Sequence, residues 1–278
     1  MRRITFVGNW KTYKTSKEEI NEFFNALPAY SEYFKPEHEI VLTPSVIHMD
    51  YVAALLPPYM KLGAQDCSAY SKGAHCGDTT AAQLKQCGVK YCILGHVERR
   101  KEGETDQIIN LKIKQCLEHG IVPIVCFGET LAEYDNNQTR IVLERQMRDC
   151  LAGIRDTQEM VLVYMPMWSI GTGFYTTGEY GNIIADFMRK TAAKYTGNPM
   201  SANCTILFGG QITATNTIEY MECPEIDGVI FAISALQPKE FAEITKVQFS
   251  IKKYQKVDHS EIDPKKIEKA RAEYDKKN

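Results

Sequence analysis

The sequence lacks any apolar run long enough to cross a membrane, and we expect no secretory signal peptide. A bilayer span needs about 20 consecutive apolar residues, and no segment approaches that length. The apolar run Ile4–Val7, which follows Met1, Arg2 and Arg3, is also too short for the hydrophobic region of a signal peptide. We therefore expect a cytoplasmic protein without a membrane partner.

Charge of one sign and paired cysteines are also missing. The chain has 33 basic and 35 acidic residues, a net charge of −2, so it has no global basic field to bind nucleic acid. Nine cysteines are scattered singly with no C-x-x-C pair, which favours a reduced compartment over a disulfide framework. The six histidines show no metal-ligand spacing with acidic or thiol partners. We expect neither a metal nor a cofactor.

The pattern that is present is an alternation of short β-rich runs with helical segments. With 278 residues, 44% of them hydrophobic, the chain can bury a sizeable core. Eight such βα units favour an α/β fold, a (β/α)8 barrel in a single domain over residues 1–250, with an open doubly wound sheet as the alternative. The expected strands are Ile4–Val7, Ile40–Thr43, Lys61–Gly63, Tyr91–Leu94, Val122–Cys126, Val161–Tyr164, Thr205–Phe208 and Val229–Phe231.

The last segment, residues 251–278, differs in composition from the rest. It has many charged and few apolar residues, and Pro264 precedes a stretch rich in Lys, Glu and Ala. This pattern predicts a solvated C-terminal extension with one polar helix around Lys265–Asp275. A partner-binding role for the extension is the alternative.

Several polar residues follow the expected strands, where a barrel enzyme carries its active site. Asn9 and Lys11 follow the first strand; the lysine could hold an anionic substrate or be an ordinary surface residue. His96 and Glu98 follow the fourth strand. The histidine is a candidate electrophile or acid–base group, with a structural histidine as the alternative.

Two glycine-containing segments follow the sixth and seventh strands. The run Pro166–Gly173 places small residues between larger apolar ones, which is typical of a hinged lid. Gly209 and Gly210 precede Gln211 and would allow backbone N–H groups to face an anion.

Taken together, these segments resemble one enzyme family. The motifs are N-W-K, G-H-x-E-R-R, C-x-G-E, P-x-W-x-I-G-T-G and G-G, in that order after strands one, four, five, six and seven. They closely resemble triosephosphate isomerase, from about Ile4 to Phe241 with almost no change in length. The family interconverts a triose ketose phosphate and its aldose by moving a proton between adjacent carbons through an enediolate.

The resemblance implies a role for each matching residue. Asn9 and Lys11 would polarise and hold the substrate, His96 would be a neutral electrophile at the carbonyl oxygen, and Glu98 would be the supporting carboxylate. The closing lid would span Pro166–Thr177, and its matching residues are Pro166, Trp168, Gly171, Thr172 and Gly173.

The resemblance also implies a phosphate site and a partner. Gly171, Gln211 and the loop after the eighth strand, with Ala232 and Ile233, would supply N–H groups to the phosphate of a small sugar phosphate. The segment 65–78 resembles the family's long dimer-forming loop and implies a homodimer. In it, Cys76 stands where the family usually has a threonine that reaches into the neighbouring site.

The chain departs from the family at the residues that matter most for catalysis. The family's sixth strand ends in Y-E-P-V-W, and its glutamate removes the carbon-bound proton; here Met165 takes that place, and a thioether has no useful basicity near neutral pH. The family's Gly-Gly after the eighth strand is replaced by Ala232 and Ile233, whose Cβ atoms resist positive φ and would crowd an anion. Val97 also replaces a serine beside His96.

Two functional hypotheses follow from these departures. The first is a triosephosphate isomerase homologue that is strongly impaired or inactive in the family reaction, with Met165 as a core-filling side chain or as an apolar wall of a changed pocket. The second is an active aldose–ketose isomerase on triose phosphate or another small sugar that uses a different base. Glu179 is one candidate base, although its expected place at a helix start favours a capping or surface role.

Overall fold

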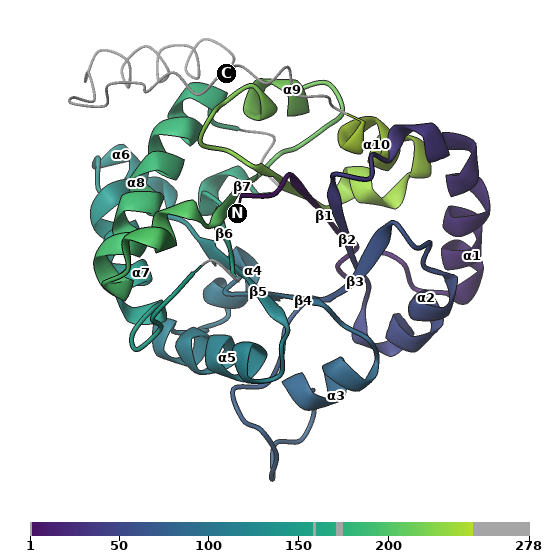
Figure 1. Cartoon of the computed structure of the whole chain (residues 1–278), viewed down its shortest axis with the longest axis horizontal. Coiled ribbons are helices and arrows are strands. Elements are labelled where there is room, and N and C mark those ends of the chain that lie inside the picture. Colours follow the sequence, from purple (N-terminus) through teal and green to yellow (C-terminus); the bar gives the residue numbers. More distant parts are fainter. Residues whose placement is uncertain (1, 158–159, 171–174, 247–278) are drawn as a thin grey trace.

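The computed structural model describes residues 2–157, 160–170 and 175–246, and Figure 1 shows these residues as a closed ring of strands surrounded by helices. Eight parallel strands pair in chain order, and β1 pairs with β8 to close the barrel. The strands are β1 (Thr5–Asn9), β2 (Glu39–Thr43), β3 (Met60–Ala64), β4 (Tyr91–Leu94), β5 (Val122–Phe127), β6 (Val161–Tyr164), β7 (Thr205–Gly209) and β8 (Gly228–Phe231). The predicted (β/α)8 barrel is confirmed, and each expected strand is present with its ends within two residues.

Helices connect successive strands and cover the outside of the barrel (Figure 1). The α-helices are α1 (Lys17–Ala26), α2 (Met49–Leu55), α3 (Ala81–Gln86), α4 (Val97–Lys101), α5 (Asp106–Glu118), α6 (Leu131–Asp135), α7 (Thr139–Cys150), α8 (Gly178–Thr196), α9 (Thr217–Met221) and α10 (Pro238–Thr245). Short 3₁₀ segments are η1 (Leu27–Tyr33), η2 (Val46–His48), η3 (Met167–Ser169), η4 (Pro199–Asn203) and η5 (Ile233–Leu236). None of the described helices combines the length and apolar character needed to cross a bilayer.

Local sequence signals explain where several helices begin and end. Ser16 and Glu19 form a capping box at the start of α1, because the Ser16 hydroxyl accepts from the Glu19 N–H while the Glu19 carboxylate accepts from the Ser16 N–H. Gly88 and Gly120, which follow α3 and α5, have φ values of +83° and +62°. They adopt the left-handed conformation that ends many helices.

The core has two layers, because side chains alternate along each strand between the barrel interior and the helices. One set lies between the sheet and the helices and includes Phe6, Ile40, Leu62, Ile206 and Phe231. The other set fills the barrel interior and includes Val7, Val41, Ile93, Val163, Met165, Leu207 and Ile230. Because side chains fill the interior, we expect a reaction site in the loops that follow the strands.

One segment extends beyond the ring of helices. The segment 65–78 between β3 and α3 protrudes from the rim (Figure 1). Within this segment the rings of Tyr70 and His75 stack with centroids 3.8 Å apart. The predicted boundary at residue 250 and the predicted helix 265–275 lie outside the described residues.

Candidate active site

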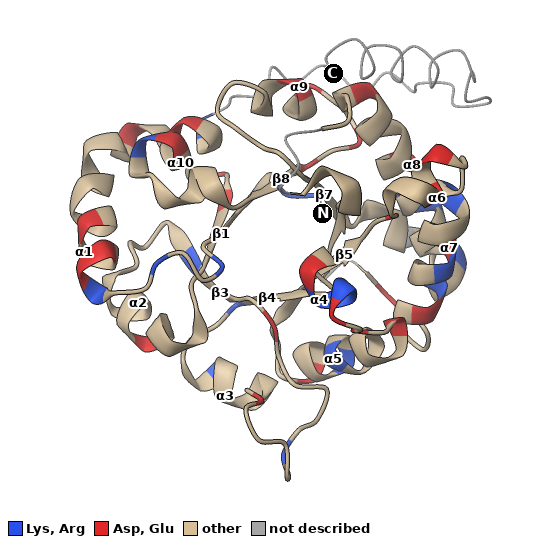
Figure 2. Cartoon of the chain, turned by 180° about the vertical axis from the view of Figure 1, so that it is seen from behind, with Lys and Arg blue, Asp and Glu red and all other residues tan. Residues whose placement is uncertain are grey.

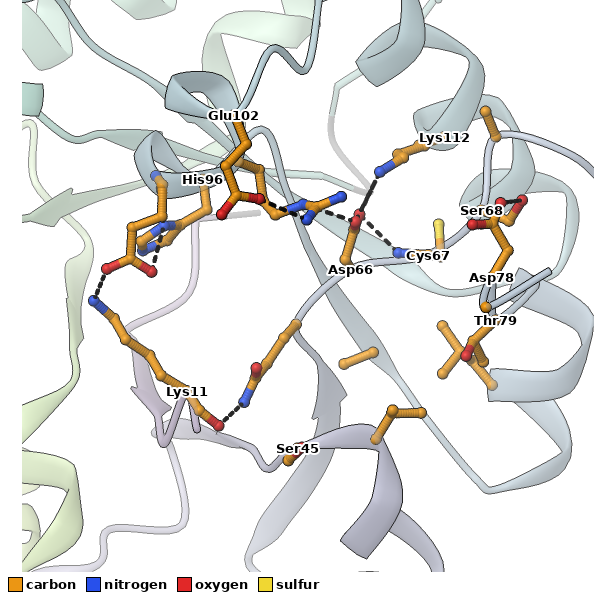
Figure 3. A pocket seen from close by; sticks show the side chains of 18 of the residues that line it. Lys11, Ser45, Asp66, Cys67, Ser68, Asp78, Thr79, His96, Glu102 and Lys112 are labelled. Atoms are coloured by element: carbon orange, nitrogen blue, oxygen red, sulfur yellow. Dashed lines mark hydrogen bonds and ion pairs between the residues drawn. The ribbon is translucent and has the colours of Figure 1, made fainter. Parts of the chain in front are cut away.

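Asn9, Lys11, His96 and Glu98 come together at the ends of β1 and β4. Figure 2 shows α4, with acidic and basic residues, beside the barrel opening. All four residues line one cavity of ≈ 790 Å³. The Lys11 ammonium donates to Oε1 of Glu98 at 2.5 Å, and Oε2 of Glu98 lies 3.7 Å from Nδ1 of His96 (Figure 3).

Lys11 is held in an uncommon backbone conformation. Its φ is +48°, and among the described residues Asn137 is the other non-glycine residue with positive φ. Two side chains hold this geometry, because the Lys11 N–H donates to Oδ1 of Asn9 at 2.9 Å and Nε2 of Gln65 donates to the Lys11 carbonyl oxygen at 2.8 Å. The backbone strain is thus located at the residue that directs a positive charge into the cavity.

His96 is kept neutral by its surroundings. Burial lowers the pKa of His96 to about 4, the Lys11 charge acts in the same direction, and Glu98 opposes both. Nδ1 of His96 accepts a hydrogen bond from the Glu98 N–H at 3.3 Å, so the proton of the neutral ring resides on Nε2. For the neighbouring carboxyl, burial acts to raise the pKa of Glu98, but the hydrogen bond from Lys11 and the nearby positive charges outweigh it and lower that pKa.

Met165 follows β6 and points into the barrel interior. Its side chain is 2% exposed and belongs to the interior cluster with Val163, Leu207 and Ile230. Its backbone passes so close to Gly128 that a Cβ on Gly128 would lie 1.9 Å from the Met165 carbonyl oxygen. The position is therefore a core position with a fixed backbone, which fits the core-filling interpretation of Met165.

The first part of the predicted lid is anchored by a buried carboxylate that the sequence analysis did not single out. Oε1 of Glu129 accepts hydrogen bonds from the Tyr164 hydroxyl and from Nε1 of Trp168, both at 3.0 Å. Burial raises the pKa of Glu129. The Glu129 carbonyl oxygen also accepts from the Met167 N–H at 2.9 Å, so the chain after Pro166 is held to the loop after β5. The predicted lid residues Gly171, Thr172 and Gly173 lie outside the described residues.

The loop after β8 contains Ala232 and Ile233 in place of the family's two glycines. Ala232 has a negative φ of −119°, so this position does not require a glycine. Ile233 begins η5 with its side chain 65% exposed, so it projects from the loop and does not fill the barrel. Val97 is fully buried in the interior cluster, so its place beside His96 is apolar.

Gln211 and Glu179 are not among the residues that line the cavity of the Lys11–Glu98 pair. Gln211 follows β7, is partly buried, and its carbonyl oxygen accepts from Nδ2 of Asn216 at 2.7 Å. Glu179 is an exposed residue of the first turn of α8, as the sequence predicts.

Comparisons with known proteins agree with this geometry. Residues 4–248 match the family model described as triosephosphate isomerase. The chain belongs to the triosephosphate isomerase family. It is 35% identical to the triosephosphate isomerase of Dictyoglomus thermophilum, over 88% of this chain and all of that protein. It is 33% identical to that of Trichodesmium erythraeum over 89% of this chain and all of that protein, and 35% identical to that of Alkaliphilus oremlandii over 88% and 99%.

The cluster of Lys11, His96 and Glu98 can be compared with the triosephosphate isomerase family. In triosephosphate isomerase a neutral histidine acts as the electrophile. The neutral state of His96 therefore matches a property of the family. Gln65 and Glu129 were missed as supporting residues. The C-x-G-E motif contains Glu129, but nothing in the sequence connects Gln65 to Lys11.

Proposed function

We propose that the chain is a triosephosphate isomerase homologue that binds a small sugar phosphate at the barrel opening but is strongly impaired in the family reaction. One observation carries the proposal: the position of the family's base is Met165, whose side chain is buried in the barrel interior. A general base contributes about 10²–10⁴-fold to a rate, and here it would perform the central proton transfer. The turnover of triose phosphates should therefore fall by at least that factor.

The positions of three candidate carboxylates support the same proposal. Glu98 is bound to Lys11, Glu129 accepts from Tyr164 and Trp168, and Glu179 lies on the exposed first turn of α8. The alternative is an active aldose–ketose isomerase that uses a different base. It is favoured by the neutral His96 and by the Lys11 ammonium, the two groups that would polarise a carbonyl and hold an anion.

The deciding experiment replaces Met165. We expect wild type and Met165→Gln to interconvert triose phosphates very slowly, and Met165→Glu to gain at least about 10²-fold. Gln is the matched control, since it has the size of Glu without a basic oxygen. Strong wild-type turnover would contradict the proposal and favour the alternative. Calorimetry with dihydroxyacetone phosphate then tests whether the protein binds a sugar phosphate. A folded Met165→Glu variant that neither binds nor isomerises this compound would refute a retained phosphate site.

We further propose that the protein forms a homodimer through the segment 65–78 and is cytoplasmic. The protruding segment and the exposed apolar residues Tyr13, Val46, Ile47 and Tyr70 support an interface on this side of the barrel. All nine cysteines are free thiols, which fits a reducing compartment. Light scattering should give a dimer for wild type and for the control Ile141→Asp on exposed α7, and a monomer for Tyr70→Asp. A dimer in all three would contradict this interface.

A further inference from the structure

Three cysteine side chains converge where the loop after β3, β4 and α5 meet. Cys67 lies in the segment after β3, Cys92 lies in β4, and Cys116 lies in α5. Their sulfur atoms all lie within 4.8 Å of one another, and the Cys67 and Cys116 sulfurs are 3.6 Å apart. The three residues are 4%, 0% and 0% exposed. Neither the family reaction nor the proposed sugar-phosphate site uses these thiols.

The spacing of the three sulfurs matches the requirements of a metal ion. A metal–thiolate bond is about 2.3 Å long, so three sulfurs around one ion in a plane are about 4.0 Å apart. A disulfide between Cys67 and Cys116 would need a sulfur–sulfur distance of about 2.05 Å and would leave Cys92 unused. The observed sulfur–sulfur distances are close to those around a metal ion and far longer than a disulfide bond.

We propose that Cys67, Cys92 and Cys116 form a buried binding site for a thiophilic cation, with monovalent copper as the favoured ion. Sulfur-only ligand sets select ions such as Cu(I) and Zn(II). Structural zinc sites are almost always four-coordinate. Among the described residues the cluster supplies three ligands, which suits Cu(I) better than Zn(II).

The backbone on both sides of Cys67 is fixed before any ion binds. The Cys67 N–H donates to Oδ1 of Asp66 at 2.8 Å, and both oxygens of Asp66 accept from Nζ of Lys112 at 2.7 and 2.8 Å. Lys112 belongs to α5, the helix that also carries Cys116. On the other side, the Ser68 N–H donates to the carbonyl oxygen of Thr79 at 2.8 Å. Such supporting contacts orient metal ligands and strengthen binding.

The site has a route from solvent. Cys67, Asp66 and Lys112 line the ≈ 790 Å³ cavity, so an ion can reach the Cys67 sulfur from solvent (Figure 3). Cys92 and Cys116 lie behind it in the core. Three thiolates around a monovalent ion leave excess negative charge, and the nearby Lys112 ammonium is already paired with Asp66 and Glu104.

The test uses the full-length, reduced protein under anaerobic conditions. Cu(I) is titrated in competition with a chromophoric Cu(I) chelator, and X-ray absorption of the wild-type complex counts the ligand atoms. We expect one tightly bound ion with three sulfur ligands at about 2.3 Å. Cys116→Ala should weaken binding at least about tenfold, while Cys204→Ala, which removes another fully buried thiol, should bind as wild type does.

Two outcomes would overturn the proposal. One is equal affinity in wild type, Cys116→Ala and Cys204→Ala, which would place the ion on thiols nearer the surface, namely Cys76, Cys87 and Cys223. The other is a wild-type spectrum with fewer than three sulfur ligands. The spectrum decides the question even if Cys116→Ala fails to fold, because it needs no variant.

Discussion

The terminal methyl group of Met165 packs against Gly209 of the neighbouring strand, so closely that a Cβ placed on Gly209 would lie 2.7 Å from it. The thioether thus occupies space above β7 that is available because residue 209 has no side chain. The contact explains how an apolar side chain is accommodated at the end of β6, where the family has an acidic one. It also makes the stability of the protein sensitive to residue 165.

A series of substitutions at Met165 should separate packing from charge. Met165→Leu conserves volume and should cost less than about 1.5 kcal/mol in the free energy of unfolding. Met165→Ala should cost about 2–5 kcal/mol, because it opens a cavity in the barrel interior. Met165→Glu should cost about 1–3 kcal/mol at neutral pH, since a carboxylate replaces a buried apolar group. Urea denaturation measures all three, and an unchanged stability in Met165→Ala would show that the side chain is not packed.

The neutral state of His96 predicts an acid sensitivity. The pKa of His96 is lowered from 6.5 to about 4 in the folded protein. As the pH falls through this window the unfolded chain binds a proton that the folded protein does not, so the folded state loses up to about 3 kcal/mol of stability. His96→Gln removes this difference. The free energy of unfolding, measured from pH 7 to pH 4, should therefore fall less steeply in His96→Gln than in wild type.

A control accompanies this comparison. Burial also lowers the pKa of His38, so some acid sensitivity should remain in His96→Gln. The difference between the two proteins isolates His96. Parallel curves for wild type and His96→Gln would mean that His96 titrates normally in the folded state.

The sequence predicts the fold well because its signals are local. Alternating short apolar runs locate all eight strands, and the Ser16 and Glu19 pair locates the start of α1. The order of the polar motifs then locates the site, since a parallel barrel brings the residues after each strand to one end. These inferences need the spacing of residues along the chain and nothing about distant contacts.

The remaining features depend on contacts between distant segments. The positive φ of Lys11 is maintained in part by Gln65, and the three cysteines meet only because β4, α5 and the loop after β3 are neighbours in the folded barrel. No spacing rule reveals either. Because Ala232 and Ile233 replace the family's glycines, the sequence predicts a changed loop. It does not predict that the Ile233 side chain projects outward.

Glycines after β8 should strengthen phosphate binding. In the present loop Ala232 has a negative φ and the side chain of Ile233 is exposed. We expect this side chain to crowd an anion that approaches the Ile233 N–H. The double variant Ala232→Gly with Ile233→Gly should bind dihydroxyacetone phosphate about tenfold more tightly, because free N–H groups can turn toward the phosphate.

A single substitution separates the two possible causes. Ile233→Ala removes the crowding without adding backbone freedom, so it should give only part of the gain. Isothermal titration calorimetry measures all three proteins. Equal affinity in wild type and in the double variant would mean that this loop does not contact the phosphate.

The ion pair between Lys11 and Glu98 makes the last prediction, because an anionic ligand must compete with Glu98 for the same ammonium group. Nζ of Lys11 and Oε1 of Glu98 are 2.5 Å apart, and the Glu98 side chain is half exposed. Such an ion pair stabilises the protein by about 1 kcal/mol. Glu98→Gln removes the competing charge and should tighten the binding of inorganic phosphate about fivefold at low ionic strength, with a smaller gain at high salt. Glu102→Gln is the matched control, since Glu102 lines the same cavity but pairs with Arg99. Tighter binding in Glu98→Gln alone would establish that Lys11 receives the anion, whereas an equal gain in both variants would show only a general change in the charge of the cavity.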